Sequence, residues 1–225
     1  MTRLAEALAA LEALGEVRIR DGLSRYGIET KERVIGMPMA GIQKVGKQFG
    51  SDHDLADALW ETRVYEARML SAYVGDPALL TPAQMDRWTR DFDNWGTCDT
   101  LCFKLFDRSP HAFAMVDRWA DDPAEFVKRT AFALLASLAL HDKKCGDAPF
   151  LARLPLIDAA ASDERNFVKK GVSWALRAIG GRKSPALRAA ARELADRLAG
   201  STDKVAKWVG RDAQKAFAKA DRTKN

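Results

Sequence analysis

The sequence has few cysteines and no long apolar run, and these two absences narrow the class of protein. The only cysteines among the 225 residues are Cys98, Cys102 and Cys145. Three is a small and an odd number, which argues against a framework of disulfide bonds. We therefore expect a reducing, cytoplasmic location. Cys98 and Cys102 lie four residues apart without the partners of a zinc site, so we expect them to be buried structural thiols. No segment reaches the roughly 18 consecutive apolar residues of a membrane-spanning helix. Glutamates interrupt the first 20 residues, so we expect no signal peptide and no membrane partner.

Signatures of metal, nucleotide and hydrolase sites are also missing. The three histidines, His53, His111 and His141, are scattered and lack the spacing of metal ligands. Neither a GxGxxG fingerprint nor a P-loop can be read in the chain, and no serine lies in a nucleophile elbow. The sequence therefore indicates no metal, nucleotide or hydrolase site.

Helical periodicity is present in most of the chain, whereas no alternating strand pattern occurs. Thr81 before Pro82 is typical of a helix start, and Ser184 and Ser201 are expected to cap the last two helices. Apolar residues at helical spacing predict an all-α fold, with helices within residues 4–14, 51–75, 81–92, 121–144, 162–183, 183–200 and 201–220.

One internal similarity refines the fold prediction. Five residues recur at an offset of 41: Asp122, Phe126, Val127, Lys128 and Leu135 return as Asp163, Phe167, Val168, Lys169 and Leu176. A helical unit of about 40–47 residues is typical of HEAT and armadillo repeats. Chance similarity between two amphipathic helices is the alternative. We predict a curved α-solenoid of HEAT-like helix pairs forming one domain over residues 1–225, with an N-terminal helical segment to about residue 50 and repeats over 51–220 that present a concave face.

Positive charge is concentrated at the C-terminal end. Residues 161–225 contain 16 Lys and Arg against 7 Asp and Glu, whereas the rest of the chain contains 20 against 24. The matching segments FVKRT and FVKKG would place Lys128, Arg129, Lys169 and Lys170 on one face. Cations at repeat spacing, interleaved with Trp95 and Trp174, favour a nucleic acid as the partner. Arg177, Arg182 and Lys183 are further candidate phosphate contacts. A solvated helical surface is the alternative.

Three motifs, DNWGTCD, FVKRTAFALLA and DERNFVKKGVSWALRAIG, occur in an order and spacing that resemble the AlkD-like DNA alkylation-repair proteins, which are HEAT-like-repeat DNA glycosylases. The resemblance extends from about Tyr26 to Trp208 and is strongest from Met85 to Gly181. It implies excision of N3- or N7-alkylated purines from double-stranded DNA by a protein that acts as a monomer. RYGIET, residues 25–30, has a weaker similarity to the family's N-terminal contact segment.

The resemblance also assigns roles to individual residues. Asp99 matches the catalytic carboxylate, Trp95 and Trp174 match the tryptophans that pack against the deoxyribose and phosphates, and Arg129 matches the arginine that holds the DNA backbone. Loss of a cationic base leaves positive charge on the sugar, which a fixed carboxylate stabilises while it orients a water molecule. Because the leaving base already carries its charge and water is the nucleophile, the implied reaction requires no general acid, no metal ion and no cofactor.

One position departs from the family pattern and keeps other functions open. Family members often have an aspartate directly after the tryptophan, where this chain has Gly96. The loss of that carboxylate, and the flexibility expected of a glycine at a helix start, favour the alternative of a non-catalytic protein that binds distorted or branched DNA. A protein-interaction scaffold is a third hypothesis. The structural alternative is that Asp93 or Asn94 caps a helix, Trp95 packs in the core, and Asp99 pairs with a nearby Lys or Arg.

Overall fold

The computed structural model describes residues 2–222, which are helical apart from turns and connecting loops. The described chain contains no β-strand, only an isolated bridge between Arg33 and Val64. None of its helices is long and apolar enough to cross a bilayer. The predicted all-α fold is therefore confirmed.

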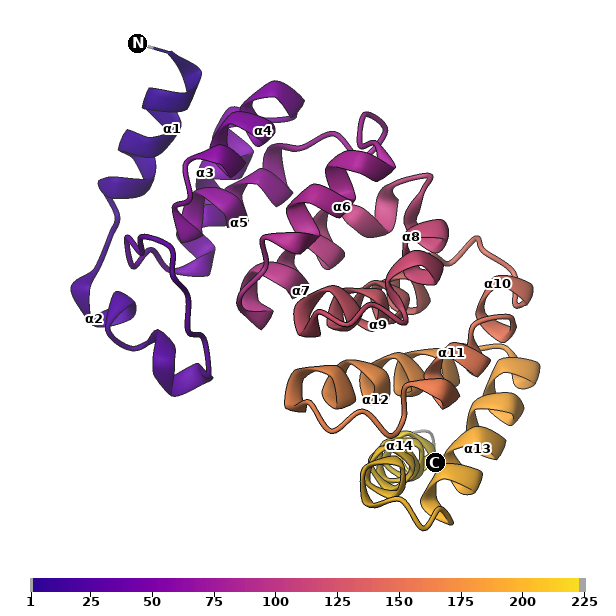
Figure 1. The fold of residues 1–225 in the computed structure, drawn as a ribbon. Helices are drawn as coiled ribbons and strands as arrows, with labels where there is room; N and C mark the ends of the chain where they lie inside the picture. The colour runs from indigo at the N-terminus through magenta and orange to yellow at the C-terminus, as the bar shows by residue number, and fades with distance from the viewer. Residues whose placement is uncertain (1, 223–225) are drawn as a thin grey trace. The chain divides into compact units, whose positions relative to one another are not determined.

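The chain divides into two compact units, Met1–Pro110 and His111–Asn225 (Figure 1). The first unit contains α1 (Arg3–Glu12), α2 (Val17–Arg20), the 3-10 helix η1 (Leu23–Tyr26), α3 (Met39–Phe49), α4 (His53–Glu61), α5 (Tyr65–Val74), α6 (Pro82–Arg90), α7 (Trp95–Lys104) and η2 (Phe106–Arg108). The second contains α8 (Ala112–Trp119), α9 (Glu125–His141), α10 (Ala148–Leu151), α11 (Leu154–Ala159), α12 (Asn166–Gly180), α13 (Pro185–Ala199) and α14 (Lys204–Arg222).

Helix α5 is the centre of the first unit, where α3, α4 and α7 pack around it. The prediction of one helix over residues 51–75 is wrong, because the chain breaks between α4 and α5. Arg63 at the break has a φ of 52°, a left-handed conformation that ends a right-handed helix. The break allows α5 to turn back and pack against α4, and the two form a helix pair.

A segment without regular structure, residues 27–38, is held against α5 by a buried carboxylate. Glu66 accepts hydrogen bonds from the backbone amides of Ile35 (2.9 Å), Gly36 (2.7 Å) and Met37 (3.2 Å). Gly36 has a φ of 90°, which strongly favours glycine. Three amides that no helix or strand satisfies thereby gain an acceptor, and the segment is fixed where α7 begins.

The second unit confirms the internal similarity. Helices α9 and α12 begin at Glu125 and Asn166, 41 residues apart, and pack directly against each other. The equivalent residues Phe126 and Phe167 lie with ring centroids 5.2 Å apart. On its other side α12 contacts α13 and α14 (Figure 1). A Cβ atom at Gly210 would lie 2.3 Å from the Ala199 amide nitrogen, so glycine allows α14 to approach α13 closely.

The predicted helix ends are mostly confirmed. Thr81 accepts from the Gln84 amide (3.1 Å), and Ser184 accepts from the Leu187 amide (3.3 Å). Helix α13 ends before Gly200. Ser201, however, does not cap the last helix. Asp203 takes that role by accepting from the amides of Val205 (2.9 Å) and Ala206 (2.8 Å), and its carboxylate also suits the positive end of the helix dipole.

Candidate nucleic-acid interface

The start of α7 brings together the aromatic and the carboxylate that the sequence singles out. Asn94 caps the helix by accepting from the Thr97 amide at 3.0 Å, and Trp95 is the first helical residue. Asp99 follows one turn later, so the indole and the carboxylate lie on the same side of α7. Both side chains are half-buried.

The indole of Trp95 is held by the N-terminal segment. Its Nε1 donates to the carbonyl oxygen of Tyr26 at 3.0 Å. Nearby, Asp93 accepts from the Thr30 hydroxyl (3.0 Å) and from the Lys31 amide (2.7 Å). Two hydrogen bonds that involve RYGIET, and one from the amide of the adjacent Lys31, therefore attach this segment to the start of α7. The motif similarity in RYGIET indicated this segment, whereas no local pattern indicated its link to Asp93.

Gly96 is tightly enclosed, contrary to the expectation of a flexible helix start. A Cβ atom at this position would lie 2.6 Å from the Tyr65 hydroxyl oxygen and 3.2 Å from both Asn94 Oδ1 and Ile28 Cδ1. Tyr65 is itself only 5% exposed, so it has little room to move. An aspartate at position 96 would require Tyr65 to shift. The departure from the family pattern is thus accommodated by local packing.

A polar pocket of about 370 Å³ lies beside the segment that precedes α7. It is lined by Lys31, Glu32, Arg63, Arg68, Arg90, Asp91, Phe92 and Asp93. Arg68 pairs with Glu32 and, at 3.0 Å, with Asp91, while its Nε donates to the Trp60 carbonyl oxygen at 3.0 Å. The Glu32 side chain is only 9% exposed, and its Oε2 has no hydrogen-bond partner among residues 2–222. Burial raises the pKa of Glu32 to about 7, although Arg68 opposes the shift.

Arg129 and Trp174, the other two residues that the resemblance singles out, lie on α9 and α12 of the second unit. Arg129 is 6% exposed and donates from Nη1 to the Phe167 carbonyl oxygen at 2.8 Å. The Trp174 side chain is half-buried. A Cβ atom at Gly171 would meet the Arg129 carbonyl oxygen at an ordinary 3.5 Å, so the packing of α9 against α12 at this position does not require glycine.

Lys128, one of the two lysines that recur at the 41-residue offset, lies beside a carboxylate. Lys128 lies 3.3 Å from Asp163, and its side chain is only 12% exposed. The two carboxylate oxygens of Asp163 also accept from Arg165 at 2.9 Å and 2.6 Å. These bonds, chiefly those from Arg165, lower the pKa of Asp163 to about 2. Lys128 therefore neutralises a carboxylate within the unit.

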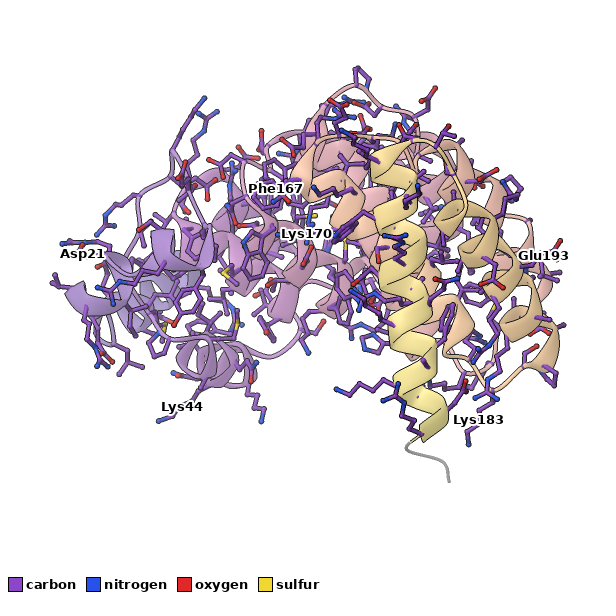
Figure 2. The ribbon with its side chains drawn as sticks, turned by 90° about the horizontal axis from the view of Figure 1, so that it is seen from below. Asp21, Lys44, Phe167, Lys170, Lys183 and Glu193 are labelled. Atoms are coloured by element: carbon purple, nitrogen blue, oxygen red, sulfur yellow. The ribbon has the colours of Figure 1, made fainter. Side chains whose placement is uncertain are left out.

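The side chain of Lys170 is more accessible to a DNA phosphate than that of Lys128. Figure 2 labels it with Phe167, one turn earlier on α12. Its side chain is exposed, and within residues 2–222 it forms no ion pair. Lys169 lies over the ring of Trp208 with Nζ 5.4 Å from the centroid, and Arg177 pairs with Asp212 at 3.3 Å. The sequence reasoning missed Trp208, although its spacing of four residues from both Lys204 and Asp212 could have indicated it.

The two cations near the end of α12 also differ. Arg182 donates to the carbonyl oxygens of Ala139 (3.0 Å), Asp142 (2.7 Å) and Cys145 (2.8 Å), and so holds the loop that follows α9. Lys183 is exposed. Of these two predicted phosphate contacts, Lys183 is the more exposed.

The thiols of Cys98 and Cys102 are buried, as predicted. Burial, reinforced by Cys98 and nearby carboxylates, raises the pKa of Cys102, so its thiol stays protonated and unreactive at neutral pH. No cluster of three His, Cys, Asp or Glu side chains in the described part of the chain could hold a metal ion.

Comparisons with known proteins identify the fold and the family of the chain. A solved structure, from "a new family of proteins related to the HEAT-like repeat DNA glycosylases with affinity for branched DNA structures", superposes with a TM-score of 0.76. The two sequences are 17% identical, and the match covers 95% of each chain, which shows a shared HEAT-like-repeat fold. No curated protein matches the sequence. The family model described as "DNA alkylation repair enzyme" matches residues 7–217. The chain therefore belongs to the DNA alkylation repair enzyme family.

Proposed function

We propose that this protein is a DNA glycosylase that removes N3- or N7-alkylated purines from double-stranded DNA. The observation that carries the proposal is the pair formed by Trp95 and Asp99, one turn apart on α7. The hydrogen bond from Trp95 to Tyr26 fixes the orientation of the indole. Membership of the family, over residues 7–217, supports the same reaction class.

The chemistry suits one carboxylate and an aromatic surface. The bond between C1′ and the base nitrogen breaks, and its electron pair neutralises the positive charge of the alkylated purine. Positive charge develops on the deoxyribose, where Asp99 would stabilise it and accept the proton of the attacking water. Trp95 and Trp174 would pack against the sugar and phosphates, and each of these aromatic contacts would contribute about 0.5–2 kcal/mol. Arg129 would hold the DNA backbone.

The test is release of free base from duplex DNA that contains N3-methyladenine or N7-methylguanine, quantified by mass spectrometry. We expect Asp99→Asn to slow release by about a hundredfold or more, since it removes the charge that stabilises the transition state. DNA binding should be unchanged or slightly tighter, because the lost carboxylate repels phosphates.

Asp54→Asn is a matched control. Asp54 is an exposed carboxylate on α4 of the same unit, and it should tolerate the change with full activity. Circular dichroism would verify that both variants are folded. Full base release by Asp99→Asn would refute the assigned role of Asp99.

A second candidate function is non-catalytic binding of branched DNA. Gly96 occupies the position where the family often has a carboxylate, and the packing of Tyr65 against it leaves no space for one. The solved structure with the same fold is described as having affinity for branched DNA. Salt-sensitive binding to branched DNA, with no base released by the wild-type protein, would favour this function.

A further inference from the structure

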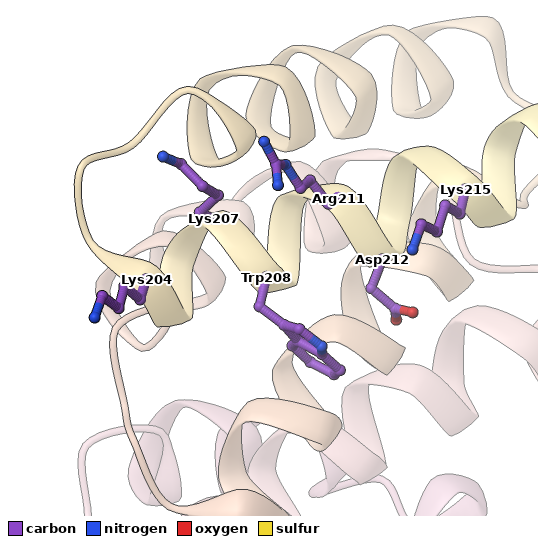
Figure 3. Close-up of a pocket in the computed structure, with 6 residues that line it drawn as sticks. All are labelled: Lys204, Lys207, Trp208, Arg211, Asp212 and Lys215. Carbon is purple, nitrogen blue, oxygen red and sulfur yellow. The ribbon is translucent and has the colours of Figure 1, made fainter.

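The last helix has an outward face that the proposed reaction does not use. The buried residues of α14 lie on one side: Ala206, Val209, Gly210, Ala213 and Phe217. The opposite side forms a shallow pocket of about 360 Å³, shown in Figure 3 and lined by Lys204, Lys207, Trp208, Arg211, Asp212 and Lys215. Trp208 is 39% exposed, which is unusual for the largest apolar side chain.

The charge of this surface is strongly positive. Four cations of α14 line the pocket, and Lys169 of α12 adds a fifth through its contact with the Trp208 ring, 5.4 Å from Nζ to the centroid. The single carboxylate, Asp212, accepts from the Ser173 hydroxyl at 2.5 Å and pairs with Arg177 at 3.3 Å, so its charge is already balanced.

None of the five cations forms an ion pair within the described part of the chain: Lys169, Lys204, Lys207, Arg211 and Lys215. Their uncompensated charge requires an anionic partner or solvent. An exposed indole with cations on both sides along a helix fits one ligand class well, a nucleic-acid strand whose bases stack on the ring while its phosphates meet the lysines.

We propose that Trp208 and these five cations, here called the α14 surface, bind an unpaired nucleotide of DNA. A base within an intact duplex is stacked on both faces and offers the indole no surface. A base in a single-stranded arm or at a junction has a free face, so the α14 surface would distinguish branched or forked DNA from plain duplex. The inference rests on the proposed function only in that the partner is DNA.

The experiment compares the binding of two fluorescein-labelled DNAs of the same duplex sequence, one fully paired and one carrying a single-stranded arm. Stacking of one base predicts that Trp208→Ala weakens binding to the forked DNA by about tenfold. Binding to the paired duplex should change by less than about twofold. Trp208→Phe, which keeps an aromatic face, should retain most of the preference for the fork.

A charge variant separates stacking from electrostatics. Lys215→Ala should weaken binding to both DNAs and lower the slope of log affinity against log salt by about one, because it removes one phosphate contact. Equal affinity of wild-type protein and Trp208→Ala for the fork, with both proteins folded by circular dichroism, would overturn the proposal. Equal weakening of fork and duplex by Trp208→Ala would also overturn it, as would binding to anionic lipid vesicles in place of DNA.

Base release from alkylated duplex distinguishes this inference from the proposed reaction. Trp208→Ala should release base from fully paired DNA at the wild-type rate, because Asp99 is unchanged. If the wild-type protein releases no base yet needs Trp208 for the fork, the proposed reaction fails and the α14 surface stands. If base is released and the preference for the fork is independent of Trp208, the proposed reaction stands and the proposed role of the α14 surface fails.

Discussion

The close contact between Gly96 and Tyr65 yields a prediction whose sign separates two effects. Alanine is favoured over glycine in a helix by up to about 1 kcal/mol. At position 96, however, the added Cβ would lie 2.6 Å from the Tyr65 hydroxyl, and overpacking of a buried site costs about 1–3 kcal/mol. We therefore expect Gly96→Ala to lower the free energy of unfolding by about 1 kcal/mol.

A double-mutant cycle locates the cause. Tyr65→Phe removes only the hydroxyl oxygen that the Cβ would meet, so Gly96→Ala should be better tolerated in its presence. The expected coupling is about 1 kcal/mol or more in favour of the double variant. Urea unfolding followed by circular dichroism gives all four free energies, and equal slopes would show that the unfolded states are comparable.

Gly171→Ala is the matched control, because a Cβ atom there has no neighbour closer than 3.5 Å. This substitution should stabilise the protein by up to about 1 kcal/mol through helix propensity. The reasoning is refuted if Gly96→Ala stabilises the protein to a similar extent, or if its effect is additive with that of Tyr65→Phe.

Three further predictions concern ionisable groups. Because the pKa of Glu32 is raised from 4.5 to about 7, the free energy of unfolding of the wild-type protein should fall as pH rises through this range. Glu32→Gln should reduce this fall by up to about 3 kcal/mol, measured by urea titrations at several pH values. Because the pKa of Asp163 is lowered from 3.8 to about 2, its contribution of about 2 kcal/mol to the free energy of unfolding should be present above pH 4 and lost towards pH 2. Asp163→Asn should not show this loss of stability in an acid titration. Lys170→Ala should weaken duplex binding and lower the salt slope by about one, whereas Lys128→Ala should change mainly stability. An unchanged pH profile, an unchanged acid transition, or equal DNA-binding losses for both lysines would contradict the respective prediction.

Periodic and local features could be predicted from the sequence. The 41-residue offset predicted two equivalent helices, and these are α9 and α12, which begin 41 residues apart and pack against each other. The spacing of Trp95 and Asp99 placed both on one side of a helix, as the structure confirms. These inferences succeed because helix geometry relates neighbours in sequence to neighbours in space.

Long-range contacts could not be predicted in the same way. The hydrogen bonds from Thr30 and Lys31 to Asp93 join residues more than 60 positions apart, and no local pattern encodes them. Nor does charge counting distinguish Lys128, which is committed to Asp163, from Lys170, which is exposed. The break at Arg63 could not be predicted, because the helical periodicity of residues 51–75 does not mark the residue at which the chain turns back to pack α5 against α4.

The three amides held by Glu66 have a consequence for hydrogen exchange. Ile35, Gly36 and Met37 donate to a side chain and to no helix or strand, so their exchange depends on one carboxylate. The three should exchange together, in a local opening that frees residues 27–38 while the helices stay closed. Such an opening would also break the hydrogen bonds from Thr30 and Lys31 to Asp93, just before α7. Exchange at these amides therefore reports how often this segment detaches from the start of α7.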